Sequence, residues 1–161
     1  MVMAFKKIGI DFHGVVSKAP DLFKQLAVKA IEQGSEVYII SGGPRAYIET
    51  YLNRLEFPYH KLWCIIDEPE VNEKTQFFAD GSFRVNDELW DGAKAKYCRA
   101  ENIDLQIDDS VVYGKYFVTP YCRFDAKMQN FYCANAVISA KQDIGTILSE
   151  LETVAPTLFP K

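Results

Sequence analysis

Acidic side chains follow three of the apolar runs in this chain, at the point where each run ends. Asp11 follows Ile-Gly-Ile, Asp67 follows Cys-Ile-Ile, and the pair Asp108-Asp109 follows Leu-Gln-Ile. A carboxylate at the end of a buried strand is costly unless water, a cation or a partner faces it. Because hard divalent ions prefer several oxygen ligands, Asp11 with Asp108 and Asp109 predicts a magnesium site. Asp67 alone is better explained as a loop or helix-capping residue.

A glycine pair follows another apolar run, in the segment Ser41-Gly42-Gly43-Pro44. Glycine lets backbone amides approach an anion closely, and the start of a following helix adds partial positive charge. Ser41 and Gly42 are therefore candidates for binding a phosphate group. Many strand-to-helix connections carry glycine for geometry alone, so this interpretation depends on the position of the segment after Asp11.

The elements that must position these residues alternate between short apolar runs and amphipathic segments of helical period. We predict strands at residues 6–12, 35–43, 61–67, 103–110 and 113–120, and helices at residues 20–33, 44–57, 91–101 and 140–154. Residues 121–138 show no clear period and are not assigned. Strands separated by helices predict parallel β-α-β units, and hence an α/β, doubly wound, Rossmann-like sandwich of three layers with a central parallel sheet. Ligands of such sheets bind at the carboxyl ends of the strands.

Length and composition indicate one domain over residues 1–161, with 48% hydrophobic and 25% charged residues. The net charge of -4, with both signs interspersed, gives no signal for nucleic-acid binding. No apolar run approaches the roughly 18 to 20 residues of a membrane span, and the N-terminal segment does not resemble an export signal. The cysteines lack metal-ligand spacing, so we expect reduced, buried thiols and a cytoplasmic location, with a disulfide left open; they are Cys64, Cys98, Cys122 and Cys133.

Residues 68–90 interrupt the alternation of strands and helices. Asp80-Gly81 lies there between two short β-prone runs, which is a strong local signal for a β-hairpin. We therefore predict a small hairpin insertion rather than a second domain. Its aromatic residues either shade a cleft or pack on the core, and the hairpin is the expected contact of a homo-oligomer; they are Phe77, Phe78, Phe83 and Trp90.

Four segments in chain order read IGIDFHGVV, YIISGG, WDGAKAKYC and LQIDDS. Intervals of 30, 53 and 14 residues separate Asp11, Ser41, Lys94 and Asp108. This ordered set resembles the four motifs of the haloacid dehalogenase (HAD) superfamily of phosphotransferases, over about the first 120 residues. Neither usual position for a cap holds a full cap domain, so the resemblance is to a small, capless, phosphatase-like member with an open cleft.

The resemblance implies a magnesium-dependent phosphomonoester hydrolase. Asp11 would attack the phosphoryl group and form an aspartyl phosphate, which water would then hydrolyse. A magnesium ion held by Asp11, Asp108, Asp109 and the backbone carbonyl of His13 would offset the repulsion between the two anions. The substrate would be a phosphorylated small molecule or a phosphorylated macromolecule, because an open cleft admits either.

Phosphate binding is implied for Ser41, for the Gly42 amide and for one lysine. Lys94 is preferred to Lys96 because it lies 14 residues before Asp108. This interval is similar to the one between the lysine and the acidic motif in members of the superfamily. Lys94 also falls in the first turn of the predicted helix, whose end would face the site. A solvated helix face is the usual place for either lysine, and only the motif context distinguishes Lys94.

His13 stands where the superfamily has a second aspartate in its first motif. That aspartate protonates the leaving oxygen and later activates water. Histidine exchanges protons near neutral pH, so His13 permits the same two transfers. An imidazolium beside magnesium is disfavoured, which predicts slow turnover or a restriction to good leaving groups. The alternative is a catalytically impaired HAD-like module that binds a phosphorylated ligand or another protein.

Overall fold

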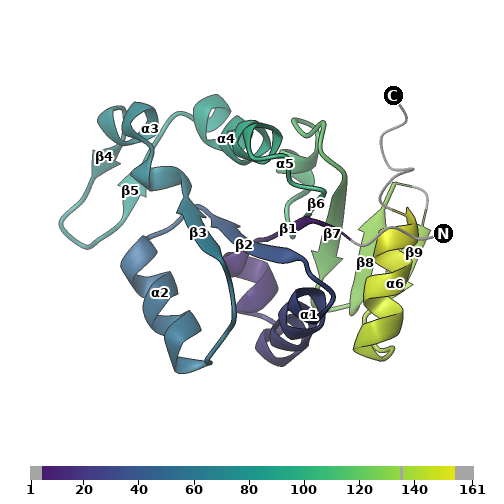
Figure 1. Cartoon of the computed structure of the whole chain (residues 1–161). Helices are drawn as coiled ribbons and strands as arrows, with labels where there is room; N and C mark the ends of the chain where they lie inside the picture. Colours follow the sequence, from purple (N-terminus) through teal and green to yellow (C-terminus); the bar gives the residue numbers. More distant parts are fainter. Residues whose placement is uncertain (1–4, 135, 155–161) are drawn as a thin grey trace.

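The computed structural model describes residues 5–134 and 136–154, so the two ends of the predicted domain and Asn135 lie outside the described residues. The described residues form a seven-stranded sheet in the order β3-β2-β1-β6-β7-β8-β9 (Figure 1). The parallel strands are β3 (Lys61–Cys64), β2 (Glu36–Ser41), β1 (Lys7–Ile10), β6 (Leu105–Asp108) and β7 (Tyr121–Asp125). The antiparallel strands are β8 (Asn130–Cys133) and β9 (Ala136–Ser139).

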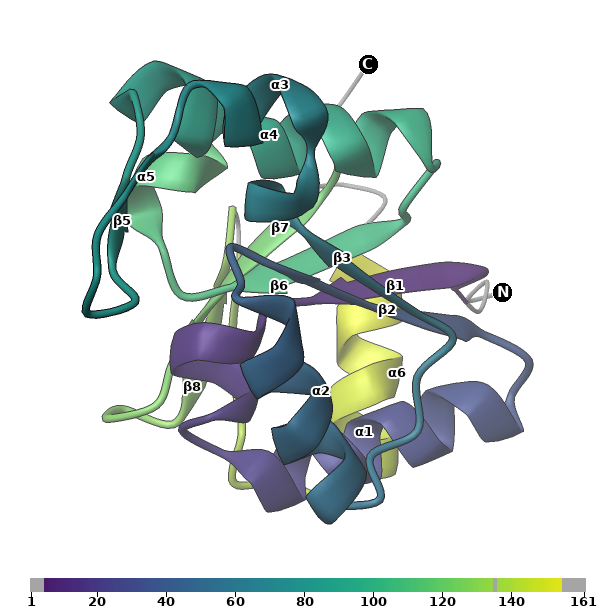
Figure 2. The same ribbon diagram turned by 90° about the vertical axis from the view of Figure 1, so that its left-hand side faces the viewer.

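Helices lie on both faces of this sheet, so the molecule has three layers (Figures 1 and 2). One face carries α1 (Pro20–Glu32), α2 (Arg45–Arg54) and α6 (Ile144–Val154), and the other carries α3 (Pro69–Glu73), α4 (Asp87–Ala100) and α5 (Val111–Gly114). Each face has its own core. Ile39 and Ile40 of β2 belong to different cores because successive side chains of a strand point to opposite faces. None of the described helices is long and apolar enough to cross a bilayer.

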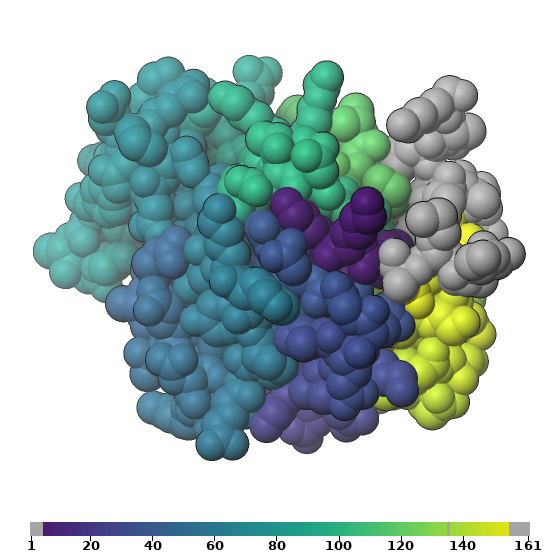
Figure 3. Space-filling model, in the orientation of Figure 1, coloured from purple at the N-terminus to yellow at the C-terminus, as the bar shows by residue number. Residues whose placement is uncertain are grey.

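Polar contacts join the chain segments at the amino-terminal ends of the strands β1 and β6. Asp104 accepts hydrogen bonds from the amides of Lys6 and Lys7, at 2.8 and 2.9 Å. Lys7 Nζ donates to the carbonyl of Glu101 at 2.9 Å. In the space-filling view, the start of β1 (purple) lies between the segment before β2 (blue) and the end of α4 (green) (Figure 3). The opposite, carboxyl-terminal edge is the one that carries the polar residues singled out in the sequence.

The segment after β6 differs from the strand predicted at residues 113–120. Ser110 Oγ accepts a hydrogen bond from the Tyr113 amide, and this cap starts the short helix α5. The fifth parallel strand begins only at Tyr121, directly after Pro120. Residues 121–138, which the sequence leaves unassigned, hold β7, β8 and all but the last residue of β9. The sheet is therefore mixed: it is parallel from β3 to β7, in keeping with the predicted central parallel sheet, and it also carries two antiparallel strands that the sequence does not predict.

Two helices begin at places other than those predicted. The helix α4 begins at Asp87 rather than at residue 91, because Asn86 Oδ1 accepts the Leu89 amide at 3.2 Å. The helix α6 begins at Ile144 rather than at residue 140, after Asp143, whose carboxylate accepts the Thr146 amide. The segment 68–90 holds α3 and two short antiparallel strands, β4 (Gln76–Phe77) and β5 (Phe83–Arg84).

Cys122 and Cys133 form a disulfide that joins β7 to β8. The expectation of reduced thiols is therefore wrong for this pair, although it holds for Cys64 and Cys98, which are free and buried. The antiparallel register of β7 and β8 brings these two cysteines together. The interval of 11 residues between them does not predict a disulfide by itself.

Candidate active site

The carboxyl ends of β1 and β6 lie side by side at the point where the winding of the sheet reverses. The chain passes from β1 outward through β2 and β3, and then returns to place β6 on the other side of β1. Asp11 directly follows β1, and its amide donates to the carbonyl of Ile107 at 2.9 Å. Asp108 ends β6. The sheet thus brings Asp11 and Asp108 together at the edge where ligands of such folds bind.

Asp11, Asp108 and Asp109 each offer a carboxylate oxygen, and these oxygens lie within 4.8 Å of one another. Asp11 and Asp108 are buried, whereas Asp109 is exposed. Asp108 Oδ1 accepts the amides of Asp109 and Ser110, at 2.9 and 3.3 Å, and Asp11 Oδ1 accepts the amide of Phe12 at 2.8 Å. This donor set fits magnesium, which favours carboxylate oxygens in a compact arrangement.

Lys94 joins the two buried acids from the helix α4. Its Nζ lies 2.9 Å from Asp11 Oδ1 and 2.8 Å from Asp108 Oδ2, and its side chain is only 3% exposed. Lys96 points elsewhere: its side chain is 82% exposed, and its Nζ lies 3.7 Å from Glu70. The structure therefore brings Lys94, which the motif context favours, to the acids, and it does not bring Lys96 there.

Burial and an excess of negative charge govern the protonation of this cluster. Burial raises the pKa of Asp11 well above its usual value, and the charge of Asp108 adds to that rise while Lys94 opposes it. Burial, followed by the charge of Asp108, also raises the pKa of Asp109. Burial lowers the pKa of Lys94, but attraction by Asp11 and Asp108 outweighs it and the net pKa is raised. Three acids against one ammonium favour the binding of further positive charge.

Ser41 ends β2, next to β1, with its side chain fully buried. Its Oγ has no hydrogen-bond partner among residues 5–134 and 136–154. A buried hydroxyl without a partner costs free energy, and a ligand oxygen would remove that cost. This unpaired Oγ is the structural feature that fits the phosphate-binding role expected of Ser41.

Two aromatic residues enclose Lys94 and the glycine loop. The Tyr113 ring centroid lies 5.0 Å from Lys94 Nζ, and the Tyr113 hydroxyl accepts a hydrogen bond from Trp90 Nε1 at 2.8 Å. The Trp90 indole lies against Gly42, where an added Cβ would come within 2.5 Å of it. The sequence does not decide whether Trp90 shades a cleft or packs on the core. It also gives no indication that Tyr113 lies at the site, because residues 113–120 have the pattern of a strand.

His13 lies in η1 (Phe12–Val16), an irregular helical turn after β1. Its ring is exposed, and Nε2 lies 3.0 Å from the carbonyl oxygen of Gly43. A carbonyl can only accept, so Nε2 carries the proton in this contact. The ring also stacks on Tyr47, with centroids 6.3 Å apart. To protonate a leaving group through Nε2, the imidazole must first release Gly43.

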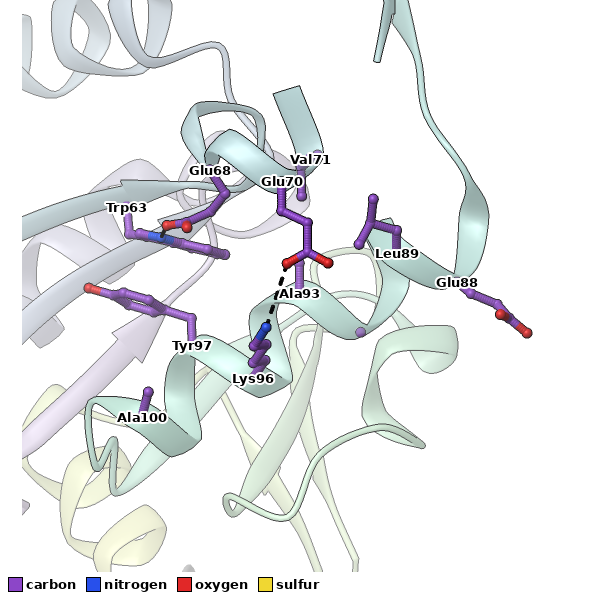
Figure 4. Close-up of a pocket in the computed structure, with 11 residues that line it drawn as sticks. Trp63, Glu68, Glu70, Val71, Glu88, Leu89, Ala93, Lys96, Tyr97 and Ala100 are labelled. Carbon is purple, nitrogen blue, oxygen red and sulfur yellow. Dashed lines mark hydrogen bonds and ion pairs between the residues drawn. The ribbon is translucent and has the colours of Figure 1, made fainter. Parts of the chain in front are cut away.

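Two further features lie apart from the acids. Asp67 is the last residue of a short 3-10 helix (Ile65–Asp67) rather than a loop or cap residue, and it accepts a hydrogen bond from Arg45 Nε at 2.7 Å. A groove of about 370 Å³ lies between α3 and α4, and none of the predicted site residues lines it (Figure 4). Glu70 and Lys96 form an ion pair beside this groove (Figure 4).

Gly14 is the residue against which Asp109 packs. An added Cβ there would lie 1.9 Å from Asp109 Oδ2, and Gly14 has φ +81°. We expect Gly14→Ala to displace the Asp109 carboxylate and weaken magnesium binding by about tenfold or more, as measured by titration calorimetry. Gly81→Ala is the matched control, because Gly81 has φ +90° but nothing within 4 Å of the added Cβ. Equal magnesium affinity in the two variants would show that the position of Asp109 does not matter for the ion.

A scan against protein-family models finds no match for this chain, and a search of curated proteins finds none either.

Proposed function

We propose that this chain is a magnesium-dependent phosphomonoester hydrolase with a doubly wound fold of the HAD superfamily, acting through an aspartyl phosphate on Asp11. One observation carries the proposal. The buried carboxylate of Asp11 shares the ammonium of Lys94 with Asp108, within 4.8 Å of two further carboxylate oxygens. A nucleophile beside a fixed cation and a set of metal ligands is the arrangement that phosphoryl transfer needs.

The chain itself prepares Asp11 for attack. Hydrogen bonds from Phe12 and Lys94 hold Oδ1, and no hydrogen bond of the described residues involves Oδ2, which is therefore the proposed attacking atom. Magnesium, held by Asp11, Asp108, Asp109 and the His13 carbonyl, would neutralise phosphoryl charge and orient the phosphoryl group. Lys94 places its positive charge beside both the nucleophile and the incoming anion.

The proposed reaction has two displacements at phosphorus. In the first, Asp11 Oδ2 bonds to phosphorus while the ester oxygen leaves with its electron pair and receives a proton, for which His13 is the candidate donor. In the second, water attacks phosphorus and passes a proton to His13, which restores the proton given up in the first step, while Asp11 leaves as a carboxylate. Ser41 Oγ and the Gly42 amide would bind phosphoryl oxygens in both steps, which would satisfy the buried hydroxyl of Ser41.

The substrate class is part of the same proposal. A phosphorylated small molecule or macromolecule would bind at the carboxyl ends of the strands, where the acids lie. The hairpin segment 68–90 exposes Phe77 and Phe78, by 55% and 45%, and would serve as the contact of a homo-oligomer.

Hydrolysis of p-nitrophenyl phosphate tests this function, because its good leaving group needs little help from an acid. We expect magnesium-dependent release of nitrophenolate, lost on chelation of the metal and restored when magnesium is returned. No release over a wide range of magnesium concentrations would contradict hydrolysis.

A second candidate function is binding of a phosphorylated ligand without turnover, by a catalytically impaired module. The observation that favours it is the hydrogen bond between His13 Nε2 and the Gly43 carbonyl, which engages the expected acid. Such a module would bind inorganic phosphate in a magnesium-dependent manner in calorimetry, yet release no nitrophenolate.

His13→Asp is expected to raise kcat for p-nitrophenyl phosphate by about tenfold, through the second displacement, in which residue 13 takes a proton from the attacking water. An aspartate is a stable anion beside magnesium and is too short to repeat the contact with Gly43. His13→Asn, which also loses that contact but cannot exchange a proton, should show no gain. Steady-state kcat values compare the three proteins, and an unchanged or lower rate for His13→Asp would contradict this account of the position.

A further inference from the structure

Arg123 lies next to the candidate active site in the register of the sheet. Its Cα is paired with that of Asp108 on the neighbouring strand β6. Side chains of paired residues project from the same face of a sheet, and paired strands lie about 4.8 Å apart. Arg123 therefore projects on the side of the sheet that carries Asp108, one strand further from Asp11.

A shallow hollow of about 280 Å³ surrounds this arginine. Ser110 and Val111, at the start of α5, line one side of it, and Tyr132 and Cys133 of β8 line the other. Ser110 also connects the hollow to the site, because its amide donates to Asp108 Oδ1. The hollow and the acidic cluster are therefore neighbours that share Ser110.

The guanidinium of Arg123 is held in place but keeps donors free. Its Cζ lies 4.5 Å from the ring centroid of Tyr132, and Nη1 lies 3.6 Å from Asp125 Oδ2. The contact with Asp125 is a long ion pair. Apart from it, no hydrogen bond from this guanidinium to another described residue is present, and the side chain is 30% exposed. An arginine has five N–H donors in a fork that matches carboxylate and phosphate oxygens.

We propose that Arg123 binds a second anionic group on the leaving portion of the substrate, a carboxylate or a second phosphate. This inference rests on the proposed phosphatase function and names its substrate class. Stacking on Tyr132 and the ion pair with Asp125 orient the fork in advance, so little side-chain freedom is lost on binding. Arg123 is a specificity-determining residue in this proposal and takes no part in the bond changes at phosphorus.

A matched pair of aryl phosphates tests the proposal. The substrates 4-carboxyphenyl phosphate and 4-carbamoylphenyl phosphate differ in one charge at nearly the same shape, and 1,4-phenylene bisphosphate carries phosphate in place of the carboxylate. We expect Arg123→Gln to lower kcat/KM by about tenfold or more for the better of the two doubly anionic substrates, and by less than about twofold for the amide. The better doubly anionic substrate identifies which anion the hollow prefers.

The control variant is Arg54→Gln, on the exposed end of α2, which should leave all three substrates unchanged. An equal loss for charged and uncharged substrates in Arg123→Gln, or no loss for any, would overturn the proposal. A catalysis-independent measurement separates it from the proposed function: calorimetry with 4-(phosphonomethyl)benzoate and 4-(phosphonomethyl)benzamide, neither of which can be hydrolysed. An Arg123-dependent preference for the benzoate supports the anion site even if hydrolysis is absent. No such preference, together with no Arg123-dependent advantage of the bisphosphate over the amide substrate, contradicts it.

Discussion

Asp11→Asn is expected to lower kcat for p-nitrophenyl phosphate by at least about 10⁴-fold, because the carboxamide cannot act as the nucleophile. The fold should tolerate the change well. The amide oxygen can still accept from Phe12 and Lys94, which Asp11 Oδ1 does at 2.8 and 2.9 Å. Burial already raises the pKa of Asp11, so removing its charge relieves a cost. Thermal unfolding and steady-state kinetics on the same preparation measure both effects.

The matched control for this variant is Asp67→Asn. Asp67 also follows an apolar run, but its carboxylate contacts Arg45 and lies apart from the acidic cluster. We expect the control to keep its activity within about twofold of the wild-type value. An Asp11→Asn protein that folds and retains more than about a tenth of the wild-type kcat would show that Asp11 is not the nucleophile.

Lys94→Met should have the largest effect on stability. It leaves Asp11 and Asp108 facing each other in a buried space without the ammonium that bridges them. Removing one partner of a buried ion pair costs about 3–5 kcal/mol of the free energy of unfolding. Loss of the same charge from the phosphoryl site should lower kcat by about 10²-fold or more. Urea unfolding in the presence of a chelator measures the first effect.

Magnesium makes this prediction specific to the acidic cluster. A bound divalent ion replaces part of the lost charge, so we expect magnesium to raise the stability of Lys94→Met more than that of the wild type. Lys96→Met is the control, since the ion pair of Lys96 with Glu70 is exposed and should contribute less than about 1 kcal/mol. Two lysine variants of equal stability, with equal response to magnesium, would contradict the bridging role of Lys94.

The sequence predicts the edge of the sheet on which the site lies, because local signals are enough there. An apolar run followed by a polar residue locates Asp11, Ser41 and Asp108, and strand-helix alternation predicts the parallel pairing that brings strand ends together. These signals do not depend on the rest of the fold. The same alternation predicts the α/β architecture, which the structure shows as a mostly parallel sheet with helices on both faces.

Side-chain contacts between distant elements could not be predicted in this way. Helical period places Lys94 and Lys96 on one helix, but only the packing of α4 on the sheet decides which of them is buried. His13 is similar: its place in the first motif indicates an acid, whereas its contact with Gly43 depends on how the turn after β1 meets the loop after β2.

The C-terminal third was the hardest part to predict because its signals compete. Residues 113–120 are rich in β-prone side chains. The first two of them nevertheless belong to the helix α5, which the cap at Ser110 starts, and the strand β7 begins only at Tyr121. The register of β7 with β8 determines the Cys122–Cys133 disulfide, and the register of β7 with β6 places Arg123 beside Asp108. Neither register can be inferred from the sequence pattern of this segment.

The central claim is that Asp11, Asp108 and Asp109 share one divalent cation. Manganese has the same preference for oxygen ligands as magnesium and can be located by anomalous diffraction. Crystals grown with manganese and measured on both sides of its absorption edge should show an anomalous peak bounded by the three carboxylates, and the peak should disappear in Asp108→Asn crystals. A manganese peak elsewhere with none between these carboxylates, at a concentration that supports activity, would contradict the account.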